Sequence, residues 1–159
     1  MALKLFQKII LVVSVCFALF LAECLIKYYY ILNKVPPKGF YFFNKLIQII
    51  FTPNPNIAFS LFLPQIIIIV IVMVILIVLS YIWWQSLIRN NLWGFAASSL
   101  IILGALSNLI DRLIFGYVID YINLFFWPVF NLADIMIVGG IMIYILSEFK
   151  KPKNNTLTI

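Results

Sequence analysis

The sequence predicts an all-α membrane protein, with four transmembrane helices and a small outer platform of strands and loops between the first two. Composition is the first reason, because 65% of the residues are hydrophobic and only 10% are charged, far from the mixture found in soluble domains. The second reason is that four apolar stretches each approach the ~20 residues that a helix needs to cross a bilayer. Lipid offers the backbone no hydrogen-bonding partners, so such stretches must be helical. We expect residues 1–159 to form a single transmembrane domain.

The predicted helices cover residues 9–30, 64–84, 92–113 and 127–146. The connection between the first two, residues 31–63, is too long for a tight turn. It contains an aromatic run at 40–43, an apolar run at 46–51 and a cluster of prolines and asparagines at 52–56, which are typical of strands and turns. We therefore expect a small sheet or platform in this loop. The polar residues 150–159 are predicted to form a mobile tail.

The positive charges set the expected orientation of the spans. Four spans place Lys4, Lys8, Arg89 and the lysines of residues 150–159 on one side, against the three lysines of the 31–63 loop. Cytoplasmic segments carry the excess of Lys and Arg, so we expect both termini to lie in the cytoplasm. The long loop and the polar residues near the ends of the other spans then meet close to the outer leaflet.

Most of the polar chemistry lies in one segment, residues 104–134. This segment contains every aspartate of the protein, Asp111, Asp120 and Asp134. Each could have a structural explanation, since a carboxylate suits the start of a predicted helix and Asp111 could pair with the adjacent Arg112. Buried charge is nevertheless costly in so apolar a chain. A cluster that includes all three aspartates therefore indicates a functional site in the membrane or at its surface.

Helical spacing brings further polar side chains into this cluster. Asn108 shares one face of the predicted third helix with Asp111 and Arg112, because the three stand at i, i+3 and i+4. Asn131 precedes Asp134 by the same spacing of three residues at the start of the fourth helix. These residues are the first candidates for the lining of the site.

Glu23 and Lys27 form an i, i+4 pair in the favourable order, with the acid before the base. This pair could lie at the membrane interface, where lysine reaches towards water, or it could belong to the site; the spacing leaves both open. Asn54 falls in the proline-rich cluster, where a turn-forming asparagine is expected for local reasons alone.

The residue types restrict the chemistry. The protein has no histidine, which excludes a histidine-based triad or histidine metal site, and we expect Cys16 and Cys24 to be packing residues. Serine chemistry has little support, because no serine pairs with Lys27 by spacing. Two carboxylates held close together share one proton, so one can draw a proton from water while the other donates one to a peptide. Which two aspartates would form this pair stays open, and no metal or cofactor is expected.

Three successive motifs carry a family resemblance: NLIDR at 108–112, VIDY at 118–121 and WPVFNLAD at 127–134. In their order and in the four-span layout they resemble the motifs of the lipoprotein signal peptidases (signal peptidase II), over most of the chain. The resemblance implies an aspartic endopeptidase of the bacterial inner membrane. Such an enzyme removes signal peptides from prolipoproteins, just before a cysteine that carries diacylglycerol. We expect a monomer that contacts membrane lipid and binds no nucleic acid.

The resemblance also implies roles for individual residues. It makes Asp120 and Asp134 the catalytic dyad and Asp111 a conformational support. The residues that it implies for the substrate site or its support are Asn54, Ala58, Phe59, Asn108, Arg112, Asn131 and Lys27. Three positions depart from the usual family pattern, with Glu23 in place of Asp, Asn56 in place of Gly and Ser107 in place of Gly.

Two other functions fit the same composition. The aspartates could relay protons in a small proton-coupled carrier, because intramembrane carboxylates also serve that purpose. The chain could also be a catalytically inactive relative that binds lipid. Cleavage of a lipidated precursor distinguishes the peptidase from both.

Overall fold

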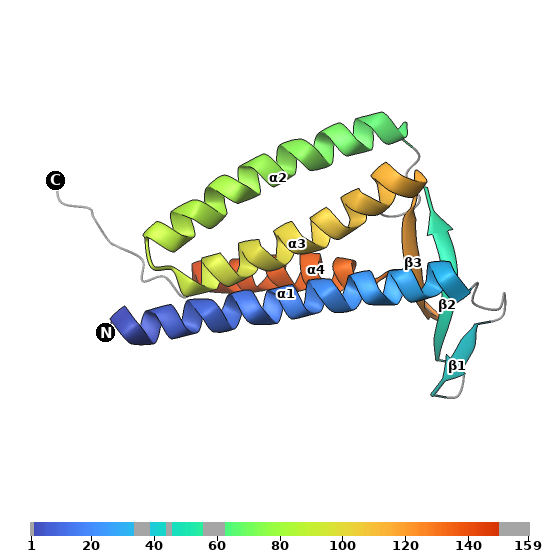
Figure 1. Ribbon diagram of the computed structural model, residues 1–159, viewed down its shortest axis with the longest axis horizontal. Coiled ribbons are helices and arrows are strands. Elements are labelled where there is room, and N and C mark those ends of the chain that lie inside the picture. The colour runs from blue at the N-terminus through green and yellow to red at the C-terminus, as the bar shows by residue number, and fades with distance from the viewer. Residues whose placement is uncertain (1, 34–38, 44–45, 56–62, 150–159) are drawn as a thin grey trace.

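The computed structural model describes residues 2–33, 39–43, 46–55 and 63–149. In these ranges the chain forms four helices, α1 (Ala2–Asn33), α2 (Gln65–Ile88), α3 (Leu92–Phe115) and α4 (Leu132–Phe149), and three strands, β1 (Phe40–Phe42), β2 (Ile47–Asn54) and β3 (Val118–Leu124). The helices run alongside one another and the sheet stands at one end of them (Figure 1). All four helices are long and apolar enough to cross a membrane. The predicted fold class is therefore confirmed.

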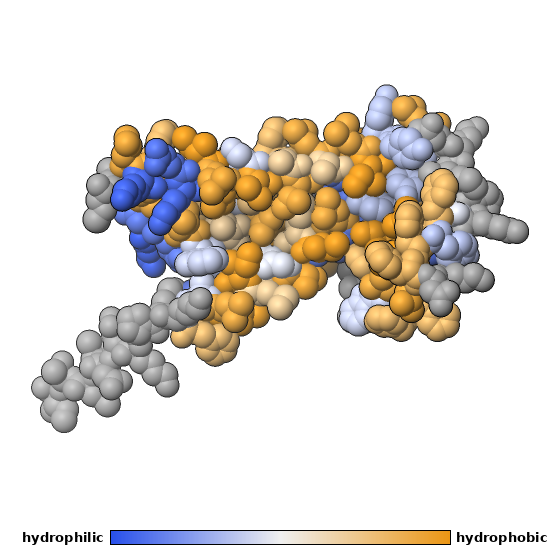
Figure 2. Space-filling model, turned by 90° about the horizontal axis from the view of Figure 1, so that it is seen from below, coloured by the Kyte–Doolittle hydropathy of each residue, from blue (hydrophilic) through white to orange (hydrophobic). Residues whose placement is uncertain are grey.

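The outward face of the helices is apolar along the middle of the molecule. Figure 2 shows this hydrophobic band, with hydrophilic residues gathered at the end where α1 begins. Along α2, side chains such as Ile66, Val74 and Ile77 are more than half exposed. An exposed aliphatic surface of this kind is stable in lipid rather than in water, so the apolar band marks the membrane-spanning part.

Helix α3 is the centre of the bundle, since α1, α2 and α4 all pack against it. Two glycines let α3 and α4 approach closely. A Cβ atom on Gly104 would lie 2.6 Å from the carbonyl oxygen of Ala133, and one on Gly140 would lie 2.7 Å from the carbonyl oxygen of Ala97. This contact positions the start of α4 against the middle of α3.

The first three helices extend beyond their predicted ends, and the fourth starts later than predicted. It begins at Leu132 and not at residue 127. Residues 127–131 instead turn back along β3, where Phe130 exchanges backbone hydrogen bonds of 2.8 and 3.0 Å with Ile122. Pro128 explains the difference, because the residue before a proline disfavours the helical backbone. The predicted tail at 150–159 lies outside the described residues.

The sheet is antiparallel, in the order β1-β2-β3. Its first two strands come from the loop between α1 and α2, as predicted. The third strand comes from the connection between α3 and α4, which the sequence did not indicate as a strand. Gly116 ends α3 in the left-handed conformation, with φ of 78°, which only glycine adopts easily. The chain can then leave the helix and return as β3.

The predicted turn cluster at 52–56 is wrong for its first part, because Thr52 to Asn54 belong to β2. Pro53 cannot donate a ladder hydrogen bond. It is accommodated because β1 pairs with β2 only at residues 47–49. The pairing of β2 with β3 is irregular between Ile49 and Thr52. Such bulges bend a strand and redirect its side chains, and this one lies directly before the residue that pairs with Asp120.

Candidate active site

Asp120 lies on β3 and its side chain is buried, with 2% of the residue exposed. Both of its carboxyl oxygens accept amide hydrogen bonds: Oδ2 from Asn54 Nδ2 at 2.7 Å and Oδ1 from Asn131 Nδ2 at 2.8 Å. Burial raises the pKa of Asp120 to about 7, the hydrogen bond from Asn54 opposes this rise, and the charge of Asp134 adds to it. Near neutral pH, Asp120 can therefore either hold or release a proton.

Asp134 lies in the first turn of α4 and is half-buried. Its Oδ1 accepts a hydrogen bond from Asn108 Nδ2 at 2.9 Å, and its Oδ2 accepts one from the backbone N–H of Asn131 at 3.2 Å. In return, Asn131 Oδ1 accepts a hydrogen bond from the backbone N–H of Asp134 at 2.9 Å. This reciprocal pattern resembles a capping box, which fixes the first turn of a helix. The carboxyl group of Asp134 is thus held by the start of its own helix.

Asn131 connects the two aspartates. It is fully buried, and its amide nitrogen lies within hydrogen-bonding distance of Asp120, of Asn108 Oδ1 at 3.1 Å and of the Ile119 carbonyl oxygen at 3.2 Å. Its oxygen and backbone N–H bond to Asp134. One side chain therefore sets the positions of a strand carboxyl and a helix carboxyl, although fourteen positions separate them in the sequence.

Lys27 is the buried cation of the site, with 4% of the residue exposed. Its ammonium pairs with Glu23 at 2.9 Å and with Asp111 at 2.8 Å. It also donates hydrogen bonds to Ser107 Oγ at 3.0 Å and to Asn108 Oδ1 at 3.2 Å. Because Asn108 is held by its oxygen, its NH2 group points towards Asp134. Lys27 thus orients an amide that contacts the candidate dyad.

Lys27 contacts a serine, Ser107, that does not pair with it by local spacing. The two residues are eighty positions apart, so no local spacing could indicate the contact. It does not make Ser107 a nucleophile, because the ammonium donates to the serine and is already paired with two carboxylates. A lysine that activates serine needs a free lone pair. Ser107, which stands where the family pattern has Gly, instead supplies a hydroxyl that accepts a hydrogen bond from the buried Lys27 ammonium.

Asp111 has different surroundings from the other two aspartates. Its Oδ2 pairs with Lys27 and accepts a hydrogen bond from the backbone N–H of Ile119 at 3.0 Å. Asp111 therefore joins α1, α3 and β3, and its contact with β3 is at the residue directly before Asp120 in the sequence. The adjacent Arg112 donates from Nη1 to the carbonyl oxygen of Asn108 at 3.3 Å, one helical turn back on α3.

Tyr121 is a residue of the site that the sequence did not single out. Its hydroxyl donates a hydrogen bond to Glu23 and accepts one from the backbone N–H of Leu132 at 3.1 Å. Its ring stacks on Tyr30, with 5.5 Å between the ring centroids. Tyr121 thus joins α1 to the first residue of α4. Glu23 is fully buried, so the interface ion pair considered for Glu23 and Lys27 is replaced by a buried pair inside the bundle.

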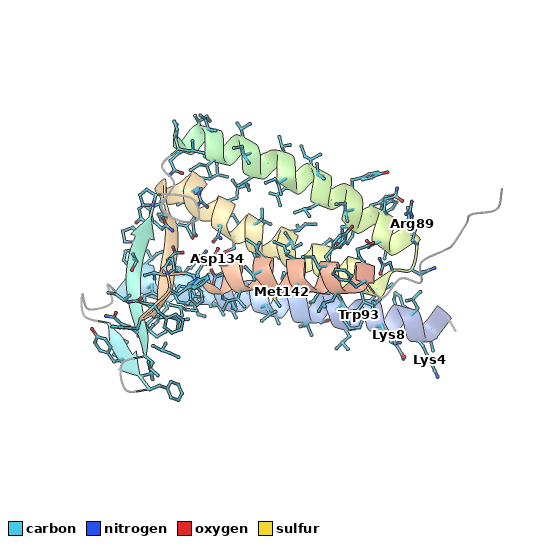
Figure 3. All side chains as sticks on the ribbon, turned by 180° about the vertical axis from the view of Figure 1, so that it is seen from behind. Lys4, Lys8, Arg89, Trp93, Asp134 and Met142 are labelled. Carbon is cyan, nitrogen blue, oxygen red and sulfur yellow. The ribbon has the colours of Figure 1, made fainter. Side chains whose placement is uncertain are left out.

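The structure brings together all the described residues that the sequence nominated. They are Glu23, Lys27, Asn54, Asn108, Asp111, Arg112, Asp120, Asn131 and Asp134, and their contacts join α1, α3, α4 and the sheet. Ala58 and Phe59 lie outside the described residues. Figure 3 shows Asp134 near the sheet, at the opposite end of the bundle from Lys4, Lys8, Arg89 and Trp93.

Comparison with known proteins identifies a matching family model and similar proteins. The family model described as signal peptidase (SPase) II matches residues 15–150. A lipoprotein signal peptidase of Vibrio campbellii is 40% identical over 77 residues, which cover 46% of this chain and 46% of the relative. One from Halothermothrix orenii is 53% identical over 57 residues, covering 36% of this chain and 39% of the relative. These matches span less than half the length of each relative.

Two solved structures of bacterial membrane enzymes, determined by the in meso method, share the fold. One has a TM-score of 0.80 and 24% identity, and the match covers 93% of both chains. The other has a TM-score of 0.75 and 25% identity, over 89% of this chain and 94% of that chain. The four apolar helices and this likeness make the protein a multi-pass membrane protein. Because the family model matches most of its length, the chain belongs to the signal peptidase II family.

Proposed function

We propose that this protein is a membrane aspartic endopeptidase that removes signal peptides from diacylglyceryl-modified prolipoproteins, with Asp120 and Asp134 as the catalytic dyad. The observation that carries the proposal is the bridge through Asn131, which bonds to the carboxyl groups of both residues. Asp111 is assigned a supporting role, because it bonds to Lys27 and to the backbone of β3 instead. Family membership and the names of the relatives support the substrate class.

The two carboxyl groups have surroundings suited to different tasks. Asp120 is buried and has a pKa of about 7, so it can hold a proton at neutral pH and donate it to the carbonyl oxygen or the leaving nitrogen. Asp134 lies in the first turn of α4, where the helix dipole favours a negative charge. Asp134 is therefore the general base that draws a proton from water. Titration of the active enzyme would belong to the pair and not to either residue alone.

The amides around the dyad provide its orientation. Asn54 and Asn131 hold Asp120, and Asn108 holds one oxygen of Asp134. Each amide is fixed by a further contact or by its backbone element, so the carboxyl groups are positioned before substrate binds. Such preorganisation lowers the cost of reaching the transition state.

The position of the dyad fits a substrate anchored in lipid. Asp134 lies at the sheet end of the bundle (Figure 3), where α1 ends and α2 and α4 begin, and therefore at the level of a membrane surface. A scissile bond beside a lipidated cysteine is held at this level. The opposite end carries Lys4, Lys8 and Arg89, so the positive-inside rule places that end, with the N-terminus, in the cytoplasm. The dyad then faces the outer leaflet.

Cleavage of a defined precursor tests this function. The purified protein is incubated with a diacylglyceryl-modified prolipoprotein and, in parallel, with the same precursor whose cysteine is unmodified. Mass spectrometry should show loss of the signal peptide just before the lipidated cysteine, and little or no cleavage of the unmodified precursor. Absence of cleavage by the folded protein contradicts the proposal. Proton-dependent uptake into vesicles, together with no cleavage, would support the carrier instead.

A further inference from the structure

A second site lies at the end of the bundle opposite the dyad. It is a cavity of about 440 Å³ between the end of α2, the turn into α3 and the end of α4. This volume falls within the ~300–1,000 Å³ that is usual for small-molecule sites. Its Arg89 lies at the opposite end of the bundle from Asp134 (Figure 3), so the cavity requires its own explanation.

The lining of the cavity combines both signs of charge with neutral hydrogen-bonding groups. Arg89 comes from the end of α2 and Glu148 from the last turn of α4, and Gln85 and Asn91 add amides. Asn91 uses its side-chain oxygen to cap α3, accepting a hydrogen bond from the backbone N–H of Gly94 at 3.1 Å. Its amide N–H groups are thus the part that can donate to a ligand. A ligand with a negative and a positive group would match this lining.

Two tyrosines, Tyr81 from α2 and Tyr144 from α4, line the same cavity. Their hydroxyls can accept hydrogen bonds. Together with the carboxylate of Glu148 they favour a compact ammonium group, which donates three hydrogen bonds. A trimethylammonium group has no N–H and could not satisfy these acceptors. The guanidinium of Arg89 suits a phosphate, which it can bind through two parallel hydrogen bonds.

The cavity lies at the level of lipid headgroups. α2 and α4 end here and α3 begins, and Figure 3 shows Arg89 at the same end of the bundle as Trp93, Lys4 and Lys8. Tryptophan and basic residues are typical of the interface between membrane and water. A ligand in this position is therefore in contact with the polar surface of the bilayer.

The surface next to the cavity, towards the middle of the membrane, can accommodate acyl chains. Ile77 and Val78 of α2 and Ile141 and Ile145 of α4 are all substantially exposed. Within the described residues, α2 and α4 each pack mainly on α3 and have few contacts with each other. The headgroup cavity therefore continues into an apolar surface that lipid chains can cover.

We propose that this cavity binds a phospholipid whose headgroup carries a phosphate and a primary ammonium, as in phosphatidylethanolamine. The phosphate faces Arg89 and the amide of Asn91, and the ammonium faces Glu148 and the two tyrosines. The site is separate from the peptidase chemistry, so it stands whether or not the protein cleaves lipoprotein precursors.

Native mass spectrometry of the purified protein in detergent tests this site. Phosphatidylethanolamine, phosphatidylcholine and phosphatidylglycerol with identical acyl chains are titrated separately. We expect saturable binding of phosphatidylethanolamine, tighter than that of the other two by about tenfold, as expected for one hydrogen bond to a charged group. Equal binding of phosphatidylcholine would overturn the ammonium assignment.

Variants assign the two halves of the headgroup. Arg89→Gln should weaken binding of all three lipids, and Glu148→Gln should remove the preference for phosphatidylethanolamine over phosphatidylglycerol. Lys8→Gln removes a cation from the same end of the bundle but not from the cavity, and should leave binding unchanged. Arg89 and Glu148 are exposed, so both variants are expected to fold, which thermal unfolding checks. Unchanged binding in both, or equally tight binding of soluble phosphoethanolamine, contradicts the proposal.

Discussion

Asn131 Nδ2 lies 2.8 Å from Asp120 Oδ1, and Asn131 bonds to Asp134 through its side-chain oxygen and its backbone N–H. Asn131 therefore contacts both carboxyl groups that we assign to catalysis, that of Asp120 through its side-chain amide and that of Asp134 through its backbone N–H. The side-chain NH2 group of Asn131 donates to Asp120 on β3, and its side-chain oxygen accepts a hydrogen bond from the backbone N–H of Asp134 on α4. This relationship explains how a buried strand residue and a helix N-terminus can act on one substrate.

Replacement of Asn131 should disable both carboxyl groups. Asn131→Ala leaves Asp120 Oδ1 and the Ile119 carbonyl oxygen without this donor, and it removes the side-chain oxygen that caps the backbone N–H of Asp134 at the start of α4. We expect the free energy of unfolding to fall by about 1–3 kcal/mol and kcat to fall more strongly than KM changes. Thermal unfolding and steady-state kinetics measure the two effects. Near-normal kcat in this variant would contradict the bridging role.

The pH dependence of cleavage should follow the proton that the dyad shares, which Asp120 holds at neutral pH in our assignment. Because this residue acts as the acid with a pKa of about 7, activity should decline as the pH rises above neutrality and the proton is lost. The hydrogen bond from Asn54 lowers this pKa, so Asn54→Ala should move the alkaline limb to higher pH. The pH profile of kcat/KM measures the shift. Asn123→Ala is the control, because Asn123 lies on β3 with Asp120 but bonds to Gln48 at 2.8 Å. The same shift in both variants would argue against Asp120 as the catalytic acid.

Lys27 should be essential for stability. Lys27→Met keeps the length of the side chain but leaves the buried carboxylates of Glu23 and Asp111 without their cation. Removing one partner of a buried ion pair costs about 3–5 kcal/mol, which should appear as a large fall in the free energy of unfolding. Combining Lys27→Met with Glu23→Gln and Asp111→Asn should recover part of the loss. If the triple variant recovers none of the lost free energy of unfolding, unbalanced buried charge is not the cause of the loss in Lys27→Met.

The spacing of α3 and α4 should control activity through Gly104. A Cβ there would meet the carbonyl oxygen of Ala133 at 2.6 Å, next to Asp134. Gly104→Ala should therefore push α4 away from α3, lengthen the contact between Asn108 and Asp134, and reduce kcat. Gly139→Ala is the matched control on α4, because a Cβ at Gly139 meets nothing within 4 Å. Equal kinetic effects of the two substitutions would refute this explanation.

The sequence was sufficient to predict the four helices and to nominate most residues of the candidate site. Backbone hydrogen bonding makes long apolar stretches in lipid helical, and charged side chains are so rare in this chain that three aspartates within one segment indicated a site. The spacing of three residues placed Asn131 and Asp134 near the start of the fourth helix, but their reciprocal hydrogen bonds were not predicted.

Contacts between distant elements could not be obtained in this way. Tyr121 and Ser107 contact residues of α1 that are 98 and 80 positions away, and no periodicity reports such contacts. Strand β3 was missed because its first four residues are buried on both faces, which removes the alternation that identifies a strand. The late start of α4 depends on Pro128 and on the pairing of Phe130 with Ile122, which exists only once β3 has formed.

The most direct test of the dyad is cleavage of a lipidated prolipoprotein by Asp120→Asn and Asp134→Asn. Each substitution removes a group that transfers a proton, so the rate should fall by about 10²–10⁴-fold or more, while thermal unfolding shows that the variants remain folded. Asn123→Ala should cleave at the wild-type rate. Near-normal turnover by either aspartate variant would show that the catalytic pair lies elsewhere.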